Sequence, residues 1–210
     1  MFRTFGVDLD NAIFEFNKFC AGEHPCFNGR NNTPLVKFDG SKNSKDMRFK
    51  IPEQKGTIYR GSEEVNDTIM VLGEHERVPL ITDVNMIDED ENEVIRDHLE
   101  IYQTMLEQLK KNSTMGINED YPAWKAANFS SSNAKLLLLD QADYNTHHIF
   151  FDDNAEKDKE CIVDVRDIIT GEEIDYEKFI NMYVVKVHPH RAITEPEYFI
   201  KQIEQAEAKR

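Results

Sequence analysis

The chain has 210 residues, of which 40% are hydrophobic and 10% aromatic; this is enough apolar material for a folded core and excludes wholesale disorder. Its 25 Lys and Arg stand against 40 Asp and Glu, and the net charge of −15 repels nucleic-acid phosphates and anionic lipid. We therefore expect no nucleic-acid partner and no membrane partner. Three cysteines without a Cys-x-x-Cys pair, after a start that lacks a signal-peptide core, predict a cytoplasmic protein without disulfides.

The first predicted element is an amphipathic helix over residues 8–20. A loop rich in Gly, Pro and Asn follows it over residues 22–34. The helix is predicted because apolar residues recur at steps of four, three and four, which places them on one helix face. These residues are Leu9, Ile13, Phe16 and Cys20.

Residues 35–84 contain short apolar runs that are typical of an antiparallel sheet. Apolar and charged residues alternate over 46–51, and residues 57–60 are expected to return beside them as the second strand of a hairpin. Further strands are predicted at 68–72 and 79–82. The block is therefore expected to hold three to five strands with one face exposed to solvent.

A long helix is predicted next, over a stripe of apolar residues. The acidic residues 88–91 precede this helix and Lys110 and Lys111 end it, and both charges suit the helix dipole. The stripe consists of Val94, Ile95, Leu99, Tyr102, Met105, Leu106 and Leu109.

Continuous apolar runs in the C-terminal half predict four further strands. Because these runs do not alternate with polar residues, they indicate a sheet covered on both sides, and hence an α/β fold. A last helix is predicted to begin at Thr194, whose hydroxyl can accept the backbone N–H of Glu197 in a capping box. The four runs are residues 135–140, 148–153, 161–165 and 183–187.

The most distinctive stretch is 149–154, which reads Ile-Phe-Phe-Asp-Asp-Asn. In open α/β sheets, ligands bind just beyond the carboxyl ends of the strands. Asp152 and Asp153 are expected at such an end, where two carboxylates suit Mg²⁺, a cation that prefers oxygen ligands and keeps several waters. The alternative is that both acids only start a turn, since Asp and Asn hydrogen-bond to their own backbone.

Two further residues are candidates for binding phosphate. Lys135 lies seventeen positions before Asp152 and begins the neighbouring apolar run, where its ammonium could pair with a phosphate and with nearby carboxylates. Thr4 follows the short opening stretch, and its hydroxyl suits a phosphate oxygen. The alternatives are a solvated lysine at a strand start and a simple cap before the first helix.

The order of these residues resembles motifs two, three and four of the haloacid dehalogenase-like superfamily, most of whose members are Mg²⁺-dependent phosphohydrolases. The matching residues are Thr4, Lys135 and the pair Asp152 and Asp153, and the resemblance covers about residues 1–20 and 130–205. It implies that Thr4 and Lys135 hold a phosphoryl group, while the paired acids bind Mg²⁺.

The resemblance also implies a domain arrangement. The expected fold is a Rossmann-like, mainly parallel sheet flanked by helices, with an inserted antiparallel β block. Residues 1–34 and 112–210 would form the α/β core, and residues 35–111, with the long helix, a cap-like insertion.

The chain departs from this family at the nucleophile. The family's chemistry begins with an Asp-x-Asp strand placed before the threonine motif, whereas Thr4 is already the fourth residue here. Two later stretches are imperfect substitutes, because Lys37 takes the nucleophile position before Asp39, and Asn85 replaces the second acid after Asp83. Either a segment before the first residue is missing, or the protein does not catalyse covalent phosphoryl transfer, which needs an attacking group.

We therefore expect a divergent or incomplete member of this superfamily that binds Mg²⁺ and a phosphorylated small molecule, with weak or no phosphohydrolase activity and no assigned catalytic residue. The alternative is a non-enzymatic, acidic binding or scaffold protein. The sequence predicts no oligomeric state. Four histidines lack the spacing of a metalloprotease helix and are interpreted as ordinary loop residues. They are His147, His148, His188 and His190.

Overall fold

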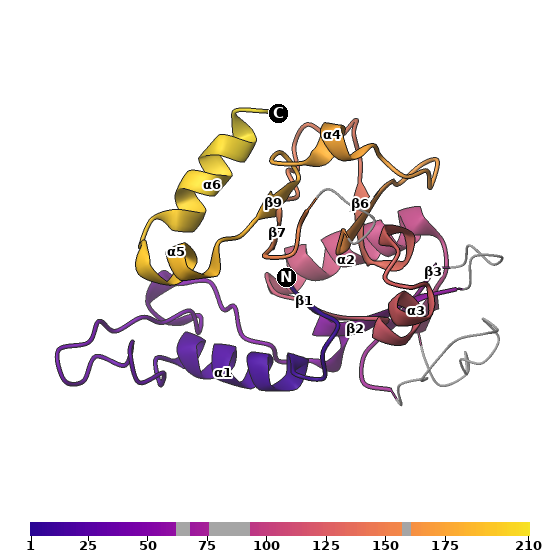
Figure 1. Ribbon diagram of the computed structural model, residues 1–210. Coiled ribbons are helices and arrows are strands. Elements are labelled where there is room, and N and C mark those ends of the chain that lie inside the picture. Colours follow the sequence, from indigo (N-terminus) through magenta and orange to yellow (C-terminus); the bar gives the residue numbers. More distant parts are fainter. Residues whose placement is uncertain (62–67, 76–92, 157–160) are drawn as a thin grey trace. The chain divides into compact units, whose positions relative to one another are not determined.

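A computed structural model describes residues 1–61, 68–75, 93–156 and 161–210 (Figure 1). The strand predicted at 79–82 and the acidic residues 88–91 lie outside these ranges. The chain divides into two compact units, which we describe separately. The N-terminal unit is Met1–Ala123 and the C-terminal unit is Trp124–Arg210.

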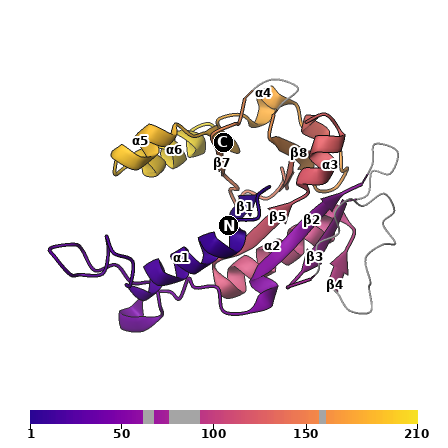
Figure 2. The same cartoon turned by 60° about the horizontal axis from the view of Figure 1, so that its bottom comes forward.

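The N-terminal unit is built on a five-stranded sheet with the order β1-β5-β2-β3-β4 (Figure 2). The first three strands in this order are parallel, whereas β2–β3 and β3–β4 are antiparallel. The prediction of a mainly parallel, Rossmann-like sheet is therefore wrong, and the fold is α/β with a mixed main sheet. The strands are β1 (Phe2–Thr4), β2 (Lys55–Arg60), β3 (Thr68–Leu72), β4 (Glu93–Ile95) and β5 (Gly116–Glu119).

The mixed sheet has a physical cause in the connection between β2 and β3. Only residues 61–67 join these strands, and a parallel neighbour needs a crossover of about a dozen residues or more. Every residue of β2 after the first is buried, and so is every residue of β3. The predicted wet face is absent from these two strands, because both of their faces are covered.

The first helix of the N-terminal unit lies where it was predicted, whereas the second helix starts later than its predicted apolar stripe. Helix α1 spans Leu9–Ala21, as predicted, and ends at Gly22, which adopts the left-handed conformation with φ 75°. Helix α2 spans His98–Asn112, so Val94 and Ile95 belong to β4 and not to the helical stripe. Asp97 caps the start of α2, because its carboxylate accepts the backbone N–H of Glu100 at 3.1 Å. Helix α3 (Tyr121–Ala126) and the short turns η1 (Ser41–Asn43) and η2 (Pro52–Gln54) complete this part of the chain.

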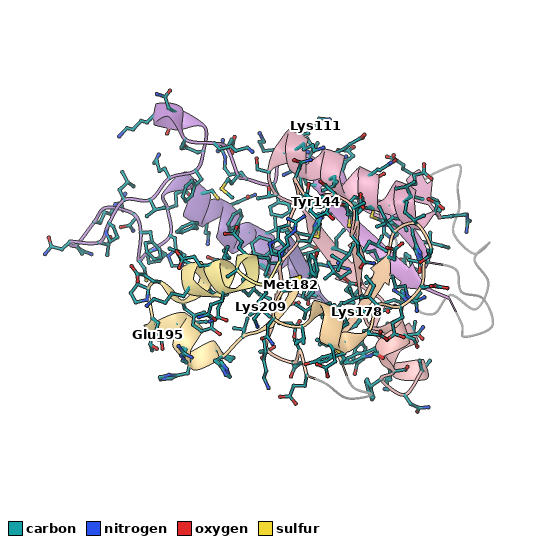
Figure 3. All side chains as sticks on the ribbon, turned by 90° about the horizontal axis from the view of Figure 1, so that it is seen from above. Lys111, Tyr144, Lys178, Met182, Glu195 and Lys209 are labelled. Atoms are coloured by element: carbon teal, nitrogen blue, oxygen red, sulfur yellow. The ribbon has the colours of Figure 1, made fainter. Side chains whose placement is uncertain are left out.

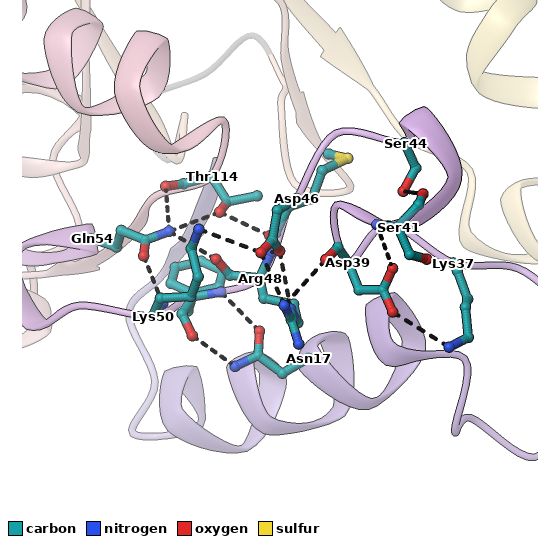
Figure 4. Close-up of polar contacts among 12 residues, drawn as sticks. Asn17, Lys37, Asp39, Ser41, Ser44, Asp46, Arg48, Lys50, Gln54 and Thr114 are labelled. Atoms are coloured by element: carbon teal, nitrogen blue, oxygen red, sulfur yellow. Dashed lines mark hydrogen bonds and ion pairs between the residues drawn. The ribbon is translucent and has the colours of Figure 1, made fainter.

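The strand predicted at 46–51 is absent, and so is its hairpin with 57–60. Side chains replace the partner strand here (Figure 4). The Asn17 side chain accepts the backbone N–H of Phe49 at 2.8 Å and donates to its carbonyl at 3.0 Å. Gln54 accepts two further backbone N–H groups from Lys50 and Ile51, at 2.7 and 3.2 Å. The alternating pattern is real, but over residues 49–51 side-chain amides, and not a partner strand, accept the backbone N–H groups.

The C-terminal unit contains two separate parallel strand pairs, β6–β8 and β7–β9. All four strands fall within or overlap the predicted apolar runs, which confirms their places in the chain. They are β6 (Lys135–Leu139), β7 (Phe150–Asp152), β8 (Val163–Asp167) and β9 (Val184–Lys186). The helical elements are η4 (Ser131–Asn133), α4 (Tyr176–Phe179), α5 (Pro189–Thr194) and α6 (Tyr198–Glu207).

The predicted start of the last helix is wrong. Thr194 is the final residue of α5, and its hydroxyl donates to the carbonyl of His190 at 2.8 Å. It therefore does not cap α6, which begins at Tyr198. A threonine hydroxyl bonded back to a carbonyl four residues earlier competes with capping, and here the back-bond prevails.

Two sequence-based expectations concern larger organisation. The predicted insertion contributes β2, β3 and β4 to a sheet that β1 and β5 complete. The division into a core of residues 1–34 and 112–210 with an insertion at 35–111 stays a prediction.

Among the residues that the structure describes, none of the helices combines the length and apolar character that crossing a lipid bilayer requires.

Candidate functional site

Lys135 is the first residue of β6, and its backbone N–H donates to the carbonyl of Ile162 at 3.0 Å. Its side chain is only 10% exposed. Lys111, Lys178 and Lys209 are exposed by contrast (Figure 3). The interpretation of Lys135 as a solvated charge at a strand start is therefore wrong, and a buried ammonium needs a partner.

Asp152 ends β7, at the carboxyl end of the parallel β7–β9 pair. Its backbone carbonyl accepts the N–H of Val187 at 2.8 Å, which fixes the strand end. Its side chain is 7% exposed. The position matches the prediction of a carboxylate at a strand end, although the strand belongs to a two-stranded sheet.

Lys135 and Asp152 form a buried ion pair, with Nζ 2.7 Å from Oδ2. The other carboxylate oxygen, Oδ1, accepts the backbone N–H of Asn154 at 2.9 Å, so Asp152 also starts a turn. Removing two charges from water costs several kcal/mol per ion, and a buried pair is poor evidence of stability for its own sake. The pair is thus a strong candidate for a functional role.

Asp153 is exposed, and its Oδ1 accepts the side-chain amide of Asn154 at 3.2 Å. The two adjacent acids therefore differ: one is buried against an ammonium and the next faces solvent. In the described part of the chain, no group of three or more His, Cys, Asp or Glu is placed to hold a metal ion. The two carboxylates still fit Mg²⁺ chemically, since Mg²⁺ sites often use one or two carboxylates, several waters and substrate phosphate oxygens.

Thr4 ends β1 in the N-terminal unit. Its hydroxyl donates to Asp8 at 2.9 Å and accepts the backbone N–H of Gly6 at 2.8 Å. A Cβ on Gly6 would lie 2.5 Å from Asp8 Oδ1, so a larger residue here would displace the Asp8 side chain. Thr4 thus closes the turn before α1, and its predicted contact with phosphate stays a prediction.

Asp39, one of the two substitutes for the missing nucleophile, is held in its own loop. It accepts the backbone N–H of Ser41 at 3.0 Å, and Lys37 Nζ lies 3.4 Å from its other oxygen. Hydrogen bonds from Ser41 lower the pKa of Asp39 from 3.8 to about 2. The other substitute, Asp83, lies outside the described residues.

A second buried charge pair was missed by the sequence analysis. Arg166 Nε donates to Asp164 Oδ2 at 2.7 Å, and the same guanidinium donates to the carbonyl of Gly171 at 3.1 Å. Strand β8 reads Val-Asp-Val-Arg-Asp, and this alternation of valine with charge was the available signal. The register pairs Lys135 with Val163 and Leu136 with Asp164, so Lys135 and Asp164 leave opposite faces of the pair.

Two of the four histidines, His147 and His188, contact the backbone or aromatic rings of neighbouring residues. His147 Nε2 lies 2.9 Å from the carbonyl of Met182, and its ring meets Tyr183 edge-on. Burial lowers the pKa of His148. The backbone N–H of His188 donates to the Tyr198 hydroxyl at 2.9 Å, next to the start of α5. His147, His148 and His188 lie outside helices and strands, as predicted. His190 lies within α5, so its interpretation as a loop residue is wrong.

We compared the chain with protein-family models, with curated proteins and with solved structures, and none of the three comparisons found a match.

Proposed function

We propose that the C-terminal unit binds Mg²⁺ and a phosphorylated small molecule, as a divergent haloacid dehalogenase-like protein. Asp152 and Asp153 would hold the metal, and Lys135 would contact the phosphate. The observation that carries this proposal is the buried Lys135–Asp152 pair, in which residues seventeen positions apart meet at 2.7 Å.

The chemistry of these groups supports the assignment. Mg²⁺ prefers oxygen ligands and bridges carboxylates to phosphates. A lysine ammonium is a compact charge with three donors, which suits phosphate oxygens. The net charge of −15 repels an anionic ligand at long range, so a phosphate-binding site on this protein needs local positive charge. Lys135 and a bound Mg²⁺ would supply that charge.

The proposal includes weak or no phosphohydrolase activity. Covalent phosphoryl transfer needs an attacking group, and Asp39 already accepts hydrogen bonds within its own exposed loop. Bound Mg²⁺ would polarise a phosphate oxygen, but polarisation alone does not provide the nucleophile. The predicted cytoplasmic location, with three free cysteines, belongs to the same proposal.

Isothermal titration calorimetry with Mg²⁺ tests the metal site. We expect binding in the wild type and its loss in an Asp152→Asn/Asp153→Asn double variant, with Asp175→Asn as the control. Asp175 is an exposed acid of the same unit that pairs with Lys178 at 3.1 Å, so the control removes one carboxylate charge away from the site, against two in the double variant. Absence of Mg²⁺ binding with and without inorganic phosphate would favour the acidic scaffold.

A generic phosphate ester tests the expected lack of catalysis. Turnover with Mg²⁺ is expected to stay near background in the wild type. Robust turnover that an Asp153→Asn variant loses would show that the chain does encode a nucleophile.

A further inference from the structure

We propose that Mg²⁺ and phosphate bind with positive coupling, because the Lys135 ammonium pairs with the Asp152 carboxylate until a phosphate binds the ammonium instead. This inference rests on the proposed function and concerns the regulation of the same site. It predicts that the site binds Mg²⁺ and the phosphorylated ligand tightly when both are present, and binds either one alone weakly.

Both carboxylate oxygens of Asp152 already accept hydrogen bonds. Oδ2 lies 2.7 Å from Lys135 Nζ, and Oδ1 lies 2.9 Å from the backbone N of Asn154. The strand end fixes the Asn154 contact, whereas the lysine contact depends on a flexible side chain. Mg²⁺ therefore competes chiefly with the ammonium for this carboxylate.

Burial makes this competition strong. A divalent cation at Asp152 would stand a few ångströms from the Lys135 ammonium, with both side chains 10% exposed or less. Like charges at such a distance repel far more in a partly buried site than in bulk water. Asp153 is exposed and can attract Mg²⁺ from solution, but it cannot relieve the repulsion inside.

Phosphate relieves the repulsion by giving the ammonium another anion. The long, unbranched lysine stem lets Nζ turn from the carboxylate to a phosphate oxygen without movement of β6. Asp152 then faces Mg²⁺, and the phosphate lies between two cations. Because coupling of two binding equilibria is reciprocal, Mg²⁺ must raise the affinity for phosphate by the same factor.

Calorimetric titrations of the full chain test the coupling. Mg²⁺ is titrated without phosphate and with saturating inorganic phosphate, and phosphate is titrated without and with saturating Mg²⁺. We expect each ligand to tighten the other by about 5-fold or more, within the range of typical couplings. Equal Mg²⁺ affinities in the two conditions would overturn the coupling and leave the proposed function standing. Absence of binding of either ligand in every titration would overturn both.

Lys135→Gln tests the assigned cause, with the exposed Lys178→Gln as the matched control. The neutral amide removes the competing charge, so Mg²⁺ alone is expected to bind more tightly than in the wild type, and phosphate is expected to give a smaller further gain than in the wild type. Wild-type coupling in the variant would contradict the role of Lys135. If this variant does not fold, as judged by circular dichroism, the wild-type titrations still decide the proposal.

Discussion

Two buried polar sites, one in each unit, satisfy their groups in different ways. In the N-terminal unit, Gln54 is fully buried and its amide serves the chain itself. Its nitrogen donates to the carbonyls of Arg48 and Thr114 and to the Thr114 hydroxyl, at 3.0 to 3.3 Å (Figure 4). In the C-terminal unit, two opposite charges, Lys135 and Asp152, face each other across 2.7 Å.

The difference shows which of the two sites can bind a ligand. The Gln54 site is neutral, and the chain's own backbone uses both its donor and its acceptor, so it holds the segment 46–54 in place. The Lys135–Asp152 pair carries charges whose burial costs several kcal/mol each, and it adjoins the exposed Asp153. The Gln54 site therefore stabilises the fold, whereas the Lys135–Asp152 pair offers a carboxylate that can bind a cation and an ammonium that can bind an anion.

The largest expected effect comes from separating the charged pair. Lys135→Met leaves the Asp152 carboxylate buried without its ammonium, and we expect a loss of about 3–5 kcal/mol in the free energy of unfolding. Urea titration followed by circular dichroism measures this loss. Lys178→Met, which breaks the exposed pair with Asp175, is expected to change stability by less than about 1 kcal/mol.

A double variant sharpens the same test. Lys135→Met/Asp152→Asn removes both charges and is expected to recover most of the stability lost in the single variant. A double variant as unstable as Lys135→Met would show that packing, and not the unpaired charge, causes the loss.

The next effect concerns the neutral site. Gln54→Ala removes an amide that serves five backbone or hydroxyl groups, and leaving several of them without partners is expected to cost about 2–4 kcal/mol. The same urea titration measures it, with the exposed Gln103→Ala of α2 as the control. Because no charge is involved, the loss is expected to be independent of salt. An effect no larger than that of the control would contradict the assigned role of Gln54.

Local patterns predicted local structure well in this chain. The period of α1 and the apolar run of β6 each depend on neighbours close in sequence, and both elements are found where they were predicted. Residues 46–51 show the limit of such patterns. Their alternation is that of a strand, but Asn17 and Gln54 take the backbone groups that a partner strand would have bonded. Nothing in the alternation itself distinguishes these two outcomes.

The candidate site was partly predictable for a similar reason. Asp152 and Asp153 end an apolar run, and a strand end is a local feature, whereas the meeting of Lys135 with Asp152 depends on two different strand pairs. The place of Lys135 at the start of a neighbouring apolar run suggested a pairing with nearby carboxylates, but it did not single out Asp152. Arg166 and Asp164 were missed because residues 161–165 were predicted as a continuous apolar run, although Asp164 lies inside that run and Arg166 directly follows it.

The smallest expected effect is the pH dependence of a half-exposed pair beside the neutral site. Hydrogen bonds from Arg48 hold the pKa of Asp46 well below its ordinary 3.8. Because the folded-state pKa is depressed, the stabilisation is complete above about pH 4 and is lost as the pH falls below it. Solvent screens the pair, so the contribution is about 0.5–1 kcal/mol.

Unfolding of the wild type and Asp46→Asn between pH 2 and pH 6 measures this contribution. The two curves are expected to differ above pH 4 and to converge at lower pH. A constant difference across the whole range would contradict the assignment to the ionised carboxylate.

Anomalous diffraction from crystals grown with Mn²⁺ and inorganic phosphate tests the central claim most directly, since Mn²⁺ accepts the same carboxylate and water ligands as Mg²⁺. We predict an anomalous peak bonded to a carboxylate oxygen of Asp152 or Asp153, with phosphate within reach of Lys135 Nζ. At saturating Mn²⁺, a map with no peak at these acids, and with Lys135 still paired to Asp152, would contradict the account.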